Sequence, residues 1–450
     1  MEKSMKLQDE IDRQYRELID ADPDNNRKGA FALQANTERS ALFLKGDRMV
    51  RTLQVPKIFT QDTICEFERI VKTANSIFEK VIREYRNSEE YRRLFPFSSE
   101  LERLILLPSG YDSVLPIARF DIFYHEDTGE FYFCEINTDG TSAMNEDRIL
   151  GELMIDNPAH QEMIRRYELS QFELFDSWVN TFLDIYDTYE RKVAHPNVAI
   201  VDFLDMGTVK EFQEFARRFQ KAGVNCEICD IRRLRYENGV LLSENGHKID
   251  AIYRRAVTSD IMKYYDQVQP FIRAVEEQKV FLAGSFCTQI IHNKWLFYVL
   301  RLDRTKCFLT KEEQEFVEAH VPETVLFAPE YIGLDEVIAH KDRYILKPLD
   351  SYACKGVYAG VDYDREQWEA YAREVYQTDY ICQHYCPQYR TENIDFVLGD
   401  GQWHPYINMT GLYVYNGKFA GIYSRLAEGG GIISSQINER AVPTYFLKSI

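Results

Sequence analysis

The sequence has no apolar run that approaches the roughly 20 residues of a membrane-spanning helix, and the stretch Met1–Asp9 lacks the apolar core of a secretion signal. From these absences we expect a cytoplasmic protein with no membrane partner. Basic residues are also scarce beside acidic ones, because 54 lysines and arginines stand against 72 aspartates and glutamates, for a net charge of −18. Phosphate backbones attract cationic surfaces, so this charge argues against a nucleic-acid partner.

Motifs of several catalytic and metal-binding classes are missing too. The 9 histidines show no His-x-x-x-His or His-Glu-x-x-His spacing, and no Gly-x-Ser-x-Gly elbow occurs. The 9 cysteines are odd in number and scattered along the chain, which fits reduced thiols. Cys226 and Cys229 form a Cys-x-x-Cys pair, but no second cysteine or histidine pair at zinc spacing lies near them in sequence. We therefore expect no zinc site.

A chain of 450 residues with 45% apolar content can build two or three packed units. The pattern of residues 1–105 is mostly helical, and apolar residues at intervals of three and four between Asp62 and Arg86 predict one amphipathic helix. We expect four segments: the helical region 1–105, a hairpin with helices over 106–192, a βαβ unit over 193–290, and a strand-rich part over 291–450 with a lid at about 341–400.

The stretch from Ala118 to Asp147 predicts a β-hairpin, because two runs rich in aromatic and β-branched residues flank Asp127-Thr128-Gly129. Arg119 and Asp121 are two apart on the first strand, and Glu135 and Asn137 are two apart on the second, so each pair shares a face. Carboxylate and amide oxygens suit Mg²⁺, which is usually shared with substrate phosphates. The alternative is a solvated polar strand face.

A lysine in an otherwise apolar strand is the second local signal. Lys347 lies in the predicted strand Tyr344–Leu349, where burial costs free energy unless the ammonium has a partner, although it can also snorkel to water. The loop 350–356 that follows offers backbone amides and Lys355 to a polyphosphate, but by itself it is more often an ordinary hairpin turn. Further strands are predicted over Val357–Val361, Tyr380–Tyr385, Asn393–Leu398 and Pro405–Val414, and a helix over Glu366–Val375.

The order of these pieces resembles a known family. A polar hairpin comes first, followed by a βαβ unit, a lysine strand, a loop and a hinge strand. The segments Arg119-Phe120-Asp121 and Glu135-Ile136-Asn137-Thr138-Asp139 are similar to the Arg-Phe-Asp and Glu-Tyr-Asn-Ala-Asp motifs of glutathionylspermidine synthase. The resemblance covers about residues 110–440 and is to the synthetase domain only. It implies a circularly permuted ATP-grasp fold of mixed α/β class, with a pre-ATP-grasp βαβ domain and a helical N-terminal region.

The resemblance also implies a role for each matching residue. Asp121, Glu135 and Asn137 correspond to magnesium ligands, and Arg119 and Arg425 to arginines at the transferring phosphoryl group. ATP is expected to contact Lys294, Lys347, Lys355 and Gly356, with the loop Ser351–Gly356 closing over its phosphates. The hinge that receives the adenine edge corresponds to Ile381, Cys382, Gln383 and His384, and Asn408 corresponds to a residue at the nucleotide or metal. Thr141 and Ser142 correspond to the region that holds the acid substrate.

An ATP-dependent carboxylate–amine ligase with Mg²⁺ is the activity that this resemblance implies. Its substrates are then a small-molecule or peptide carboxylate and an amine such as a polyamine or an amino acid. Gly140 stands where the family has a hydroxyl residue that helps hold a thiol peptide, so we expect glutathione to be a poor acid substrate. A degenerate ATP-grasp protein that only binds nucleotide and an ATP-dependent phosphotransferase remain alternatives. The sequence contains no indication of oligomeric state.

Overall fold

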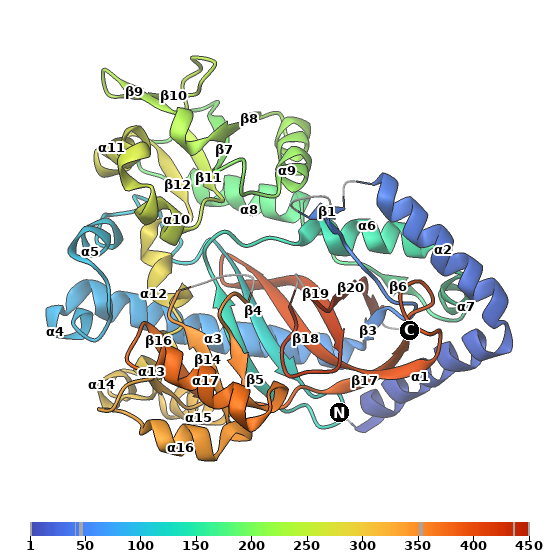
Figure 1. Ribbon diagram of the computed structural model, residues 1–450. Helices are drawn as coiled ribbons and strands as arrows, with labels where there is room; N and C mark the ends of the chain where they lie inside the picture. Colours follow the sequence, from blue (N-terminus) through green and yellow to red (C-terminus); the bar gives the residue numbers. More distant parts are fainter. Residues whose placement is uncertain (1, 41, 45–47, 351–353, 435–436, 449–450) are drawn as a thin grey trace.

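The computed structural model describes residues 2–40, 42–44, 48–350, 354–434 and 437–448. It has the mixed α/β composition that the sequence predicts, with helices packed around several separate sheets (Figure 1). Within the described ranges, no helix is long and apolar enough to cross a membrane. The N-terminal part of the chain and the C-terminal strand lie on the same side of the molecule.

The helices fall into a long N-terminal group and shorter ones between strands. They are α1 (Glu2–Ala21), α2 (Pro23–Arg39), α3 (Gln61–Asn87), α4 (Glu89–Arg92), α5 (Ser99–Ile105), α6 (Met144–Met154), α7 (Pro158–Arg166), α8 (Asp176–Asp187), α9 (Val209–Lys221), α10 (Thr258–Lys263), α11 (Gln269–Glu276), α12 (Gln289–His292), α13 (Leu296–Arg301), α14 (Asp303–Lys306), α15 (Lys311–His320), α16 (Leu334–Ala339) and α17 (Arg365–Val375).

An antiparallel six-stranded sheet lies at the centre and contains the predicted hairpin (Figure 1). Its order is β20 (Glu439–Val442), β19 (Lys418–Glu428), β18 (Trp403–Tyr415), β4 (Ile117–Tyr124) and β5 (Phe131–Asn137), and β17 (Arg390–Ile394) also pairs with β18. Strands β4 and β5 are neighbours in sequence, whereas β18 and β19 arrive from the far end of the chain. The sheet therefore brings the hairpin and the C-terminal region together.

Smaller sheets surround this centre. An antiparallel sheet of β13 (Thr324–Leu326), β16 (Tyr380–His384), β14 (Tyr344–Pro348) and β15 (Tyr358–Ala359) faces the hairpin and carries the predicted lysine strand. A three-stranded sheet joins β3 (Lys57–Phe59), β21 (Thr444–Leu447) and β6 (Leu169–Ser170). Two-stranded pairs form from β1 (Phe43–Leu44) with β2 (Arg48–Met49) and from β9 (Arg235–Glu237) with β10 (Val240–Leu242).

The predicted βαβ unit is confirmed. Strand β7 (Asn197–Asp202) pairs in parallel with β8 (Asn225–Asp230) across the helix α9, and β11 (Ala251–Arg254) and β12 (Phe281–Ala283) extend the sheet in the same direction. Cys226 and Cys229 lie on β8, and burial raises the pKa of the Cys229 thiol to about 12. Among the residues described, no three His, Cys, Asp or Glu side chains are grouped to hold a metal.

The amphipathic helix predicted from Asp62 to Arg86 is confirmed as α3, which packs against one face of the central sheet. Its N-cap is Thr60, whose hydroxyl accepts a hydrogen bond from the Thr63 amide at 3.4 Å. Phe67 and Phe78 on its buried side contact the rings of Tyr124 and Phe120 on β4. The helix thereby occupies one face of the sheet, and the polar residues of the hairpin are left to the other face.

A β-bulge determines which residues of β5 point to each face. Asp121 pairs with Glu135 while Ile122 pairs with Phe133, so Cys134 is an extra residue with no partner on β4. Phe131, Phe133 and Ile136 belong to the core beneath α3. Glu135 therefore points to the opposite face, although it is two residues after Phe133 and simple alternation would place both on the same side.

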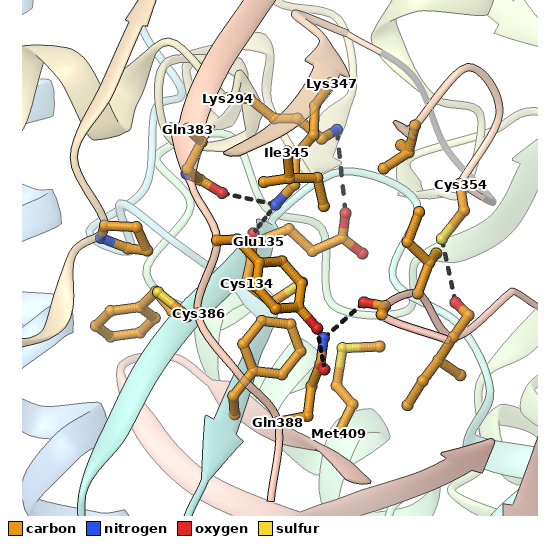
Figure 2. Close-up of a pocket in the computed structure, with 18 of the residues that line it drawn as sticks. Cys134, Glu135, Lys294, Ile345, Lys347, Cys354, Gln383, Cys386, Gln388 and Met409 are labelled. Carbon is orange, nitrogen blue, oxygen red and sulfur yellow. Dashed lines mark hydrogen bonds and ion pairs between the residues drawn. The ribbon is translucent and has the colours of Figure 1, made fainter. Parts of the chain in front are cut away.

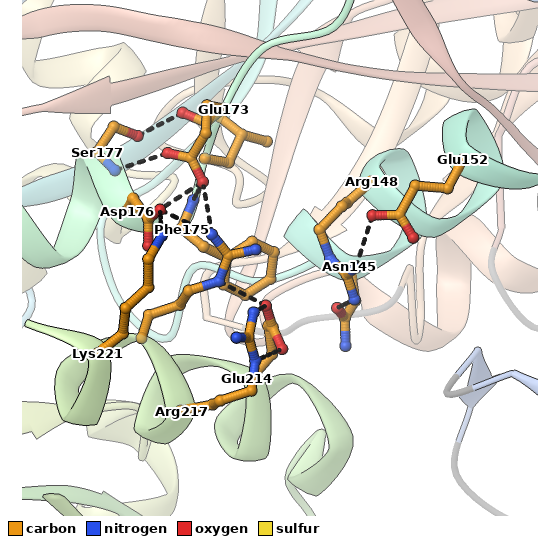
Figure 3. Close-up of polar contacts among 12 residues, drawn as sticks. Asn145, Arg148, Glu152, Glu173, Phe175, Asp176, Ser177, Glu214, Arg217 and Lys221 are labelled. Carbon is orange, nitrogen blue, oxygen red and sulfur yellow. Dashed lines mark hydrogen bonds and ion pairs between the residues drawn. The ribbon is translucent and has the colours of Figure 1, made fainter.

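Helices α8, α9 and α6 are joined by a network of ion pairs and ring contacts (Figure 3). Arg218 on α9 contacts Asp176 at 2.9 Å and Glu214 at 2.6 Å. The Phe175 ring lies between the guanidinium groups of Arg148 on α6 and Arg218, at 5.5 and 5.7 Å. Single exposed ion pairs contribute little, but a network with half-buried arginines restricts the relative movement of these helices. It attaches the parallel sheet to the rest of the molecule.

Two predicted strands are shorter than expected. The strand predicted over Val357–Val361 is only β15, because a 3₁₀ turn begins at Gly360, where any side chain would meet the Lys341 carbonyl oxygen at 1.9 Å. The strand predicted over Asn393–Leu398 ends at Ile394 as β17. Beyond it, the Asp395 carboxylate accepts hydrogen bonds from the amides of Val397 and Leu398, which folds the chain into a turn.

Candidate functional site

A cleft lies between the central sheet and the sheet that contains β14 and β16 (Figure 2). Its walls come from the hairpin, the segment before α13, Pro322 before β13, the lysine strand with its loop, the hinge strand with the residues after it, Met409 on β18, and the turn after β19. The lining residues that matter below are Cys134, Glu135, Lys294, Lys347, Lys355, Gln383, His384, Gln388 and Met409. Ile345 and Phe123 add apolar surface.

Two arginines converge on one carboxylate beside this cleft. Arg119 Nε and Nη2 donate to the two oxygens of Asp121 at 2.6 and 2.9 Å, and Arg425 Nη2 donates to Asp121 Oδ2 at 2.7 Å. Asn137 Nδ2 donates to the same oxygen at 3.1 Å. The Asp121 side chain is 0% exposed, and these contacts use its acceptor capacity. Its charge holds two guanidinium groups in fixed positions on the sheet face.

The arginine pair needs a glycine beneath it. Gly411 on β18 pairs with Asp121, and a Cβ at this position would lie 2.8 Å from both Arg119 Cδ and Asp121 Oδ1. Tyr423 on β19 is the cross-strand partner of Gly411, and its ring lies under both guanidinium groups, at 5.4 Å from Arg119 and 5.6 Å from Arg425. Glu439 on β20 adds a second carboxylate at 3.5 Å from Arg425 Nη1. The two arginines are thus packed from below and from one side.

Glu135 presents its carboxylate to the cleft, and Asn137 lies beside it on the same strand face. Burial alone would raise the pKa of Glu135, but the charges of Lys294, Arg425 and Arg119 lower it to about 2, so the carboxylate is ionised at neutral pH. Its side chain is 31% exposed, and Asn137 Nδ2 donates to its Oε1 at 3.3 Å. This orientation leaves Asn137 Oδ1 as an acceptor with no partner among the described residues.

Lys347 reaches across the cleft from β14. Its Nζ donates to Gln383 Oε1 at 2.8 Å and to the Cys134 carbonyl oxygen at 3.2 Å. The bulge explains the second contact, since the extra residue in a bulge leaves the regular ladder and its carbonyl can bind elsewhere. Figure 2 shows the resulting connection from the hinge strand through Lys347 to the hairpin. The two facing sheets are therefore joined by a buried cation.

Two further lysines complete the cationic wall. Lys294, which precedes α13, lies with its Nζ 4.0 Å from Glu135 Oε2. Lys355 lines the cleft from the loop after β14, and Gly356 next to it has a positive φ of 70° with the Tyr380 hydroxyl close to where a Cβ would stand. Residues 351–353 of the expected closing loop Ser351–Gly356 lie outside the described residues. Its last part is anchored where Cys354 Sγ contacts the Ile433 carbonyl oxygen at 3.2 Å.

Other expected site residues lie elsewhere. Ile381 and Cys382 on the hinge strand are buried in the apolar cores, while Gln383 and His384 reach the cleft. Asn408 lies on the opposite face of β18 from its neighbour Met409, and its amide donates to the carbonyl oxygens of Tyr389 and Tyr406 at 3.0 and 3.1 Å. The structure therefore does not bring Asn408 to the cleft.

Thr141 and Ser142 lie in the loop that follows the hairpin. The Thr141 hydroxyl donates to the Asn137 carbonyl oxygen at 3.0 Å, so it supports the end of β5. The Ser142 carbonyl oxygen accepts from Arg119 Nη1 and from the Tyr413 hydroxyl, both at 2.9 Å. Ser142 therefore contacts Arg119 through its backbone carbonyl, whereas Thr141 contacts the end of β5 through its hydroxyl.

The sequence matches no protein-family model and no curated protein. Among solved structures, the chain resembles a glutathione synthetase-like effector from Globodera pallida in its apo form, with a TM-score of 0.64 over 94% of this chain and 97% of that chain at 10% identity. It also matches a protein from Methylobacillus flagellatus assigned as a gamma-glutamylcysteine synthetase, with a TM-score of 0.46 over 88% of this chain and 90% of that chain, again at 10% identity. The first likeness shows that the two proteins share their overall fold.

Several residues of the site were not found by sequence reasoning. Gly411 could have been, because a glycine in the middle of a long strand often marks a close approach. Tyr423 could have been found as well, because it lies two residues before Arg425 on β19 and strand alternation places both on one face. Glu439 gave no signal, since only the pairing of β19 with β20 places it beside Arg425. Gln388, whose Nε2 donates to the Gly431 carbonyl oxygen at 2.7 Å, is likewise recognisable only in three dimensions.

The charges of the site determine which ligand it fits. Cationic side chains outnumber carboxylates in the cleft and directly beside it: Arg119, Arg425, Lys294, Lys347 and Lys355 stand against Asp121, Glu135 and Glu439. A bare divalent cation has few oxygens to bind, because the Asp121 oxygens are already engaged by arginines. An anion with several charges, carried together with one cation on Glu135 and Asn137, fits the donor set.

Proposed function

We propose that the chain is an ATP-dependent carboxylate–amine ligase, which joins an acid and an amine into an amide through an acyl phosphate. The observation that carries the proposal is the cleft lined by Lys294, Lys347 and an ionised Glu135, with Arg119 and Arg425 held on Asp121 directly beside it. The fold that this chain shares with the glutathione synthetase-like effector is consistent with it.

The proposed roles follow from position. The adenine would lie against the apolar surface of Ile345 and Met409, with its edge toward the chain at His384. Lys294, Lys347 and Lys355 would bind the phosphates. The arginine pair would then contact the terminal phosphoryl group, whose charge is spread over three oxygens during transfer. Such preorganised donors contribute more in the transition state than in the ground state.

Mg²⁺ fits the oxygens of Glu135 and Asn137, where it would offset the charge of the β- and γ-phosphates. In this proposal Asp121, which the sequence pattern groups with the metal ligands, contributes by holding the arginines. The protein's own residues perform the remaining tasks: they orient the phosphates, exclude water from the cleft and stabilise the oxyanion that forms at the acyl carbon.

The reaction would balance in two steps. A carboxylate oxygen of the acid attacks the γ-phosphorus, the bond to the bridging oxygen breaks, and ADP leaves. The nitrogen of a neutral amine then attacks the acyl carbon, the carbon–oxygen bond to phosphate breaks, and a proton leaves the nitrogen with release of phosphate. We propose small acids or peptides as the first substrate and polyamines or amino acids as the second, with glutathione as a poor acid because Gly140 provides no hydroxyl.

The test measures ADP release with a coupled assay and amide formation with mass spectrometry, over a matrix of acids and amines. A ligase releases ADP rapidly only when both an acid and an amine are present, and the product mass equals their sum minus water. If ADP is released with only one substrate present and that substrate becomes phosphorylated, the protein is a phosphotransferase instead. Binding of Mg·ATP without turnover on any pair would favour a degenerate nucleotide-binding protein, and no binding of Mg·ATP would refute the proposal.

A further inference from the structure

A buried chain of hydrogen bonds runs behind the cationic wall of the cleft. Gln383 on the hinge strand is 2% exposed, and its Oε1 accepts from Lys347 Nζ at 2.8 Å. Its Nε2 donates to Thr324 Oγ1 on β13 at 2.8 Å, and that hydroxyl donates to the Pro322 carbonyl oxygen at 2.9 Å. The other end of the chain is the contact from Lys347 Nζ to the Cys134 carbonyl oxygen at 3.2 Å.

The chemistry of the two ends fixes the direction of every bond in this chain. An ammonium group only donates and a carbonyl oxygen only accepts, so the Gln383 amide must turn its oxygen toward Lys347 and its nitrogen toward Thr324. The Thr324 hydroxyl must then direct its hydrogen to Pro322. The side chain of Gln383 therefore has a single orientation, with both ends of its amide engaged.

This network leaves Lys347 one donor for a ligand. A lysine ammonium has three N–H groups, and Gln383 and Cys134 take two of them. No partner for the third exists among the described residues, and the side chain lines the cleft. Because the ammonium is tetrahedral, two fixed bonds determine the direction of the third.

We infer that Gln383 is a positioning residue for Lys347: it directs the free N–H of the ammonium toward the phosphates while keeping the lysine charge intact. The family pattern implies instead that Gln383 contacts the adenine edge, but its amide oxygen binds Lys347 and its amide nitrogen binds Thr324. A glutamate here would pair with Lys347 and cancel the charge that a phosphate needs, whereas a neutral amide does not. The inference rests on the proposed function, because it takes ATP as the ligand of Lys347.

The experiment is a double-mutant cycle on Mg·ATP binding, measured by calorimetry on the full chain. The variants are Gln383→Met, Lys347→Met and the double variant, with Gln383→Glu as a charge probe. Gln383→Met should weaken binding about tenfold in the wild-type background, as expected for a contacting pair, and should have no further effect when Lys347 is methionine. Gln383→Glu should weaken binding more than Gln383→Met. Where turnover is measurable, the KM for ATP should rise more than kcat falls.

A matched control is Gln388→Met. Gln388 is another buried glutamine of the cleft, but its amide contacts the Gly431 carbonyl oxygen and the Tyr385 hydroxyl rather than Lys347. Its effect on binding should be the same in both Lys347 backgrounds. If Gln383→Met fails to fold, Thr324→Val removes the second anchor of the same amide, and its smaller effect on binding should also vanish in the Lys347→Met background.

The outcomes separate this inference from the proposed function. A wild-type chain that does not bind Mg·ATP overturns both. A wild-type chain that binds while Gln383→Met binds equally well, or while Gln383→Met weakens binding by the same factor in both backgrounds, overturns only the positioning role of Gln383.

Discussion

Arg425 Nη2 donates to Asp121 Oδ2 at 2.7 Å, although the two residues are 304 positions apart in the chain. This contact, with the bidentate one from Arg119, assigns Asp121 to the arginines, while Glu135 faces the open cleft. Asp121 and Glu135, two carboxylates of the same hairpin, therefore have different surroundings, and replacing each should affect the site differently.

The first prediction separates those two carboxylates by their magnesium dependence. Asp121→Asn and Glu135→Gln should each lower substrate-dependent ADP release by about 10²–10³, the usual effect of losing one preorganised electrostatic contact. The magnesium concentration at half-maximal rate should rise in Glu135→Gln but stay near the wild-type value in Asp121→Asn. Titration of Mg²⁺ in the coupled assay measures this, and an equal rise in both variants would make Asp121 a metal ligand.

The second prediction concerns the glycine beneath the arginine pair. Gly411→Ala places a methyl group 2.8 Å from Arg119 Cδ and Asp121 Oδ1, so the pair must move and turnover should fall by at least about tenfold. Overpacking should also lower the free energy of unfolding by about 1–3 kcal/mol. Gly333→Ala is the control, because a Cβ there meets nothing within 4 Å. Unchanged turnover in Gly411→Ala would mean that the pair does not need its present position.

The third prediction concerns a buried ion pair between the loop that follows the hairpin and the parallel sheet. Asp139 Oδ1 lies 2.6 Å from Arg254 Nη2, and both side chains are 1% exposed. Asp139→Asn leaves the Arg254 charge uncompensated and should destabilise the protein by about 3–5 kcal/mol. The double variant Asp139→Leu/Arg254→Met should recover part of that loss in urea denaturation. A double variant less stable than Asp139→Asn would show that Asp139 and Arg254 make stabilising contacts besides their mutual ion pair.

The fourth prediction is a pH dependence of stability at Asp147 on α6. Burial raises the pKa of this carboxyl to about 7, and its Oδ1 accepts from the Thr444 amide at 2.7 Å. Between the unfolded value of about 4 and the folded one, the folded state holds the proton and the unfolded state releases it, so stability falls as pH rises. Asp147→Asn removes this titration.

The melting temperature of Asp147→Asn, compared with that of the wild type, should therefore improve steadily from about pH 4 to pH 7 and level off above pH 8. Differential scanning fluorimetry in a series of buffers measures the trend. A difference that does not change with pH would contradict the raised pKa of Asp147.

Local patterns predicted the elements of this chain, and distant pairings determined the site. The hairpin, α3 and the lysine strand follow from spacing within about a dozen residues, and each is confirmed. The face on which Asn408 lies, and the partner of Gln383, depend on which strands pair across the molecule. Sequence periodicity contains no information about that pairing. Lys347 was recognised as unusual from its apolar neighbours, but its two acceptors come from strands that are far away in sequence.

The extra residue at Cys134 shifts the alternation of side chains along strand β5 by one position. Before Cys134, the odd-numbered positions carry the phenylalanines that pack beneath α3. After it, the odd-numbered positions carry Glu135 and Asn137 on the opposite face, where Glu135 lines the cleft. A homologous strand one residue shorter could keep every one of these side chain types and still lose the site, because either the phenylalanines or the polar pair would point to the wrong side. Deleting this single residue should therefore be more damaging than replacing it.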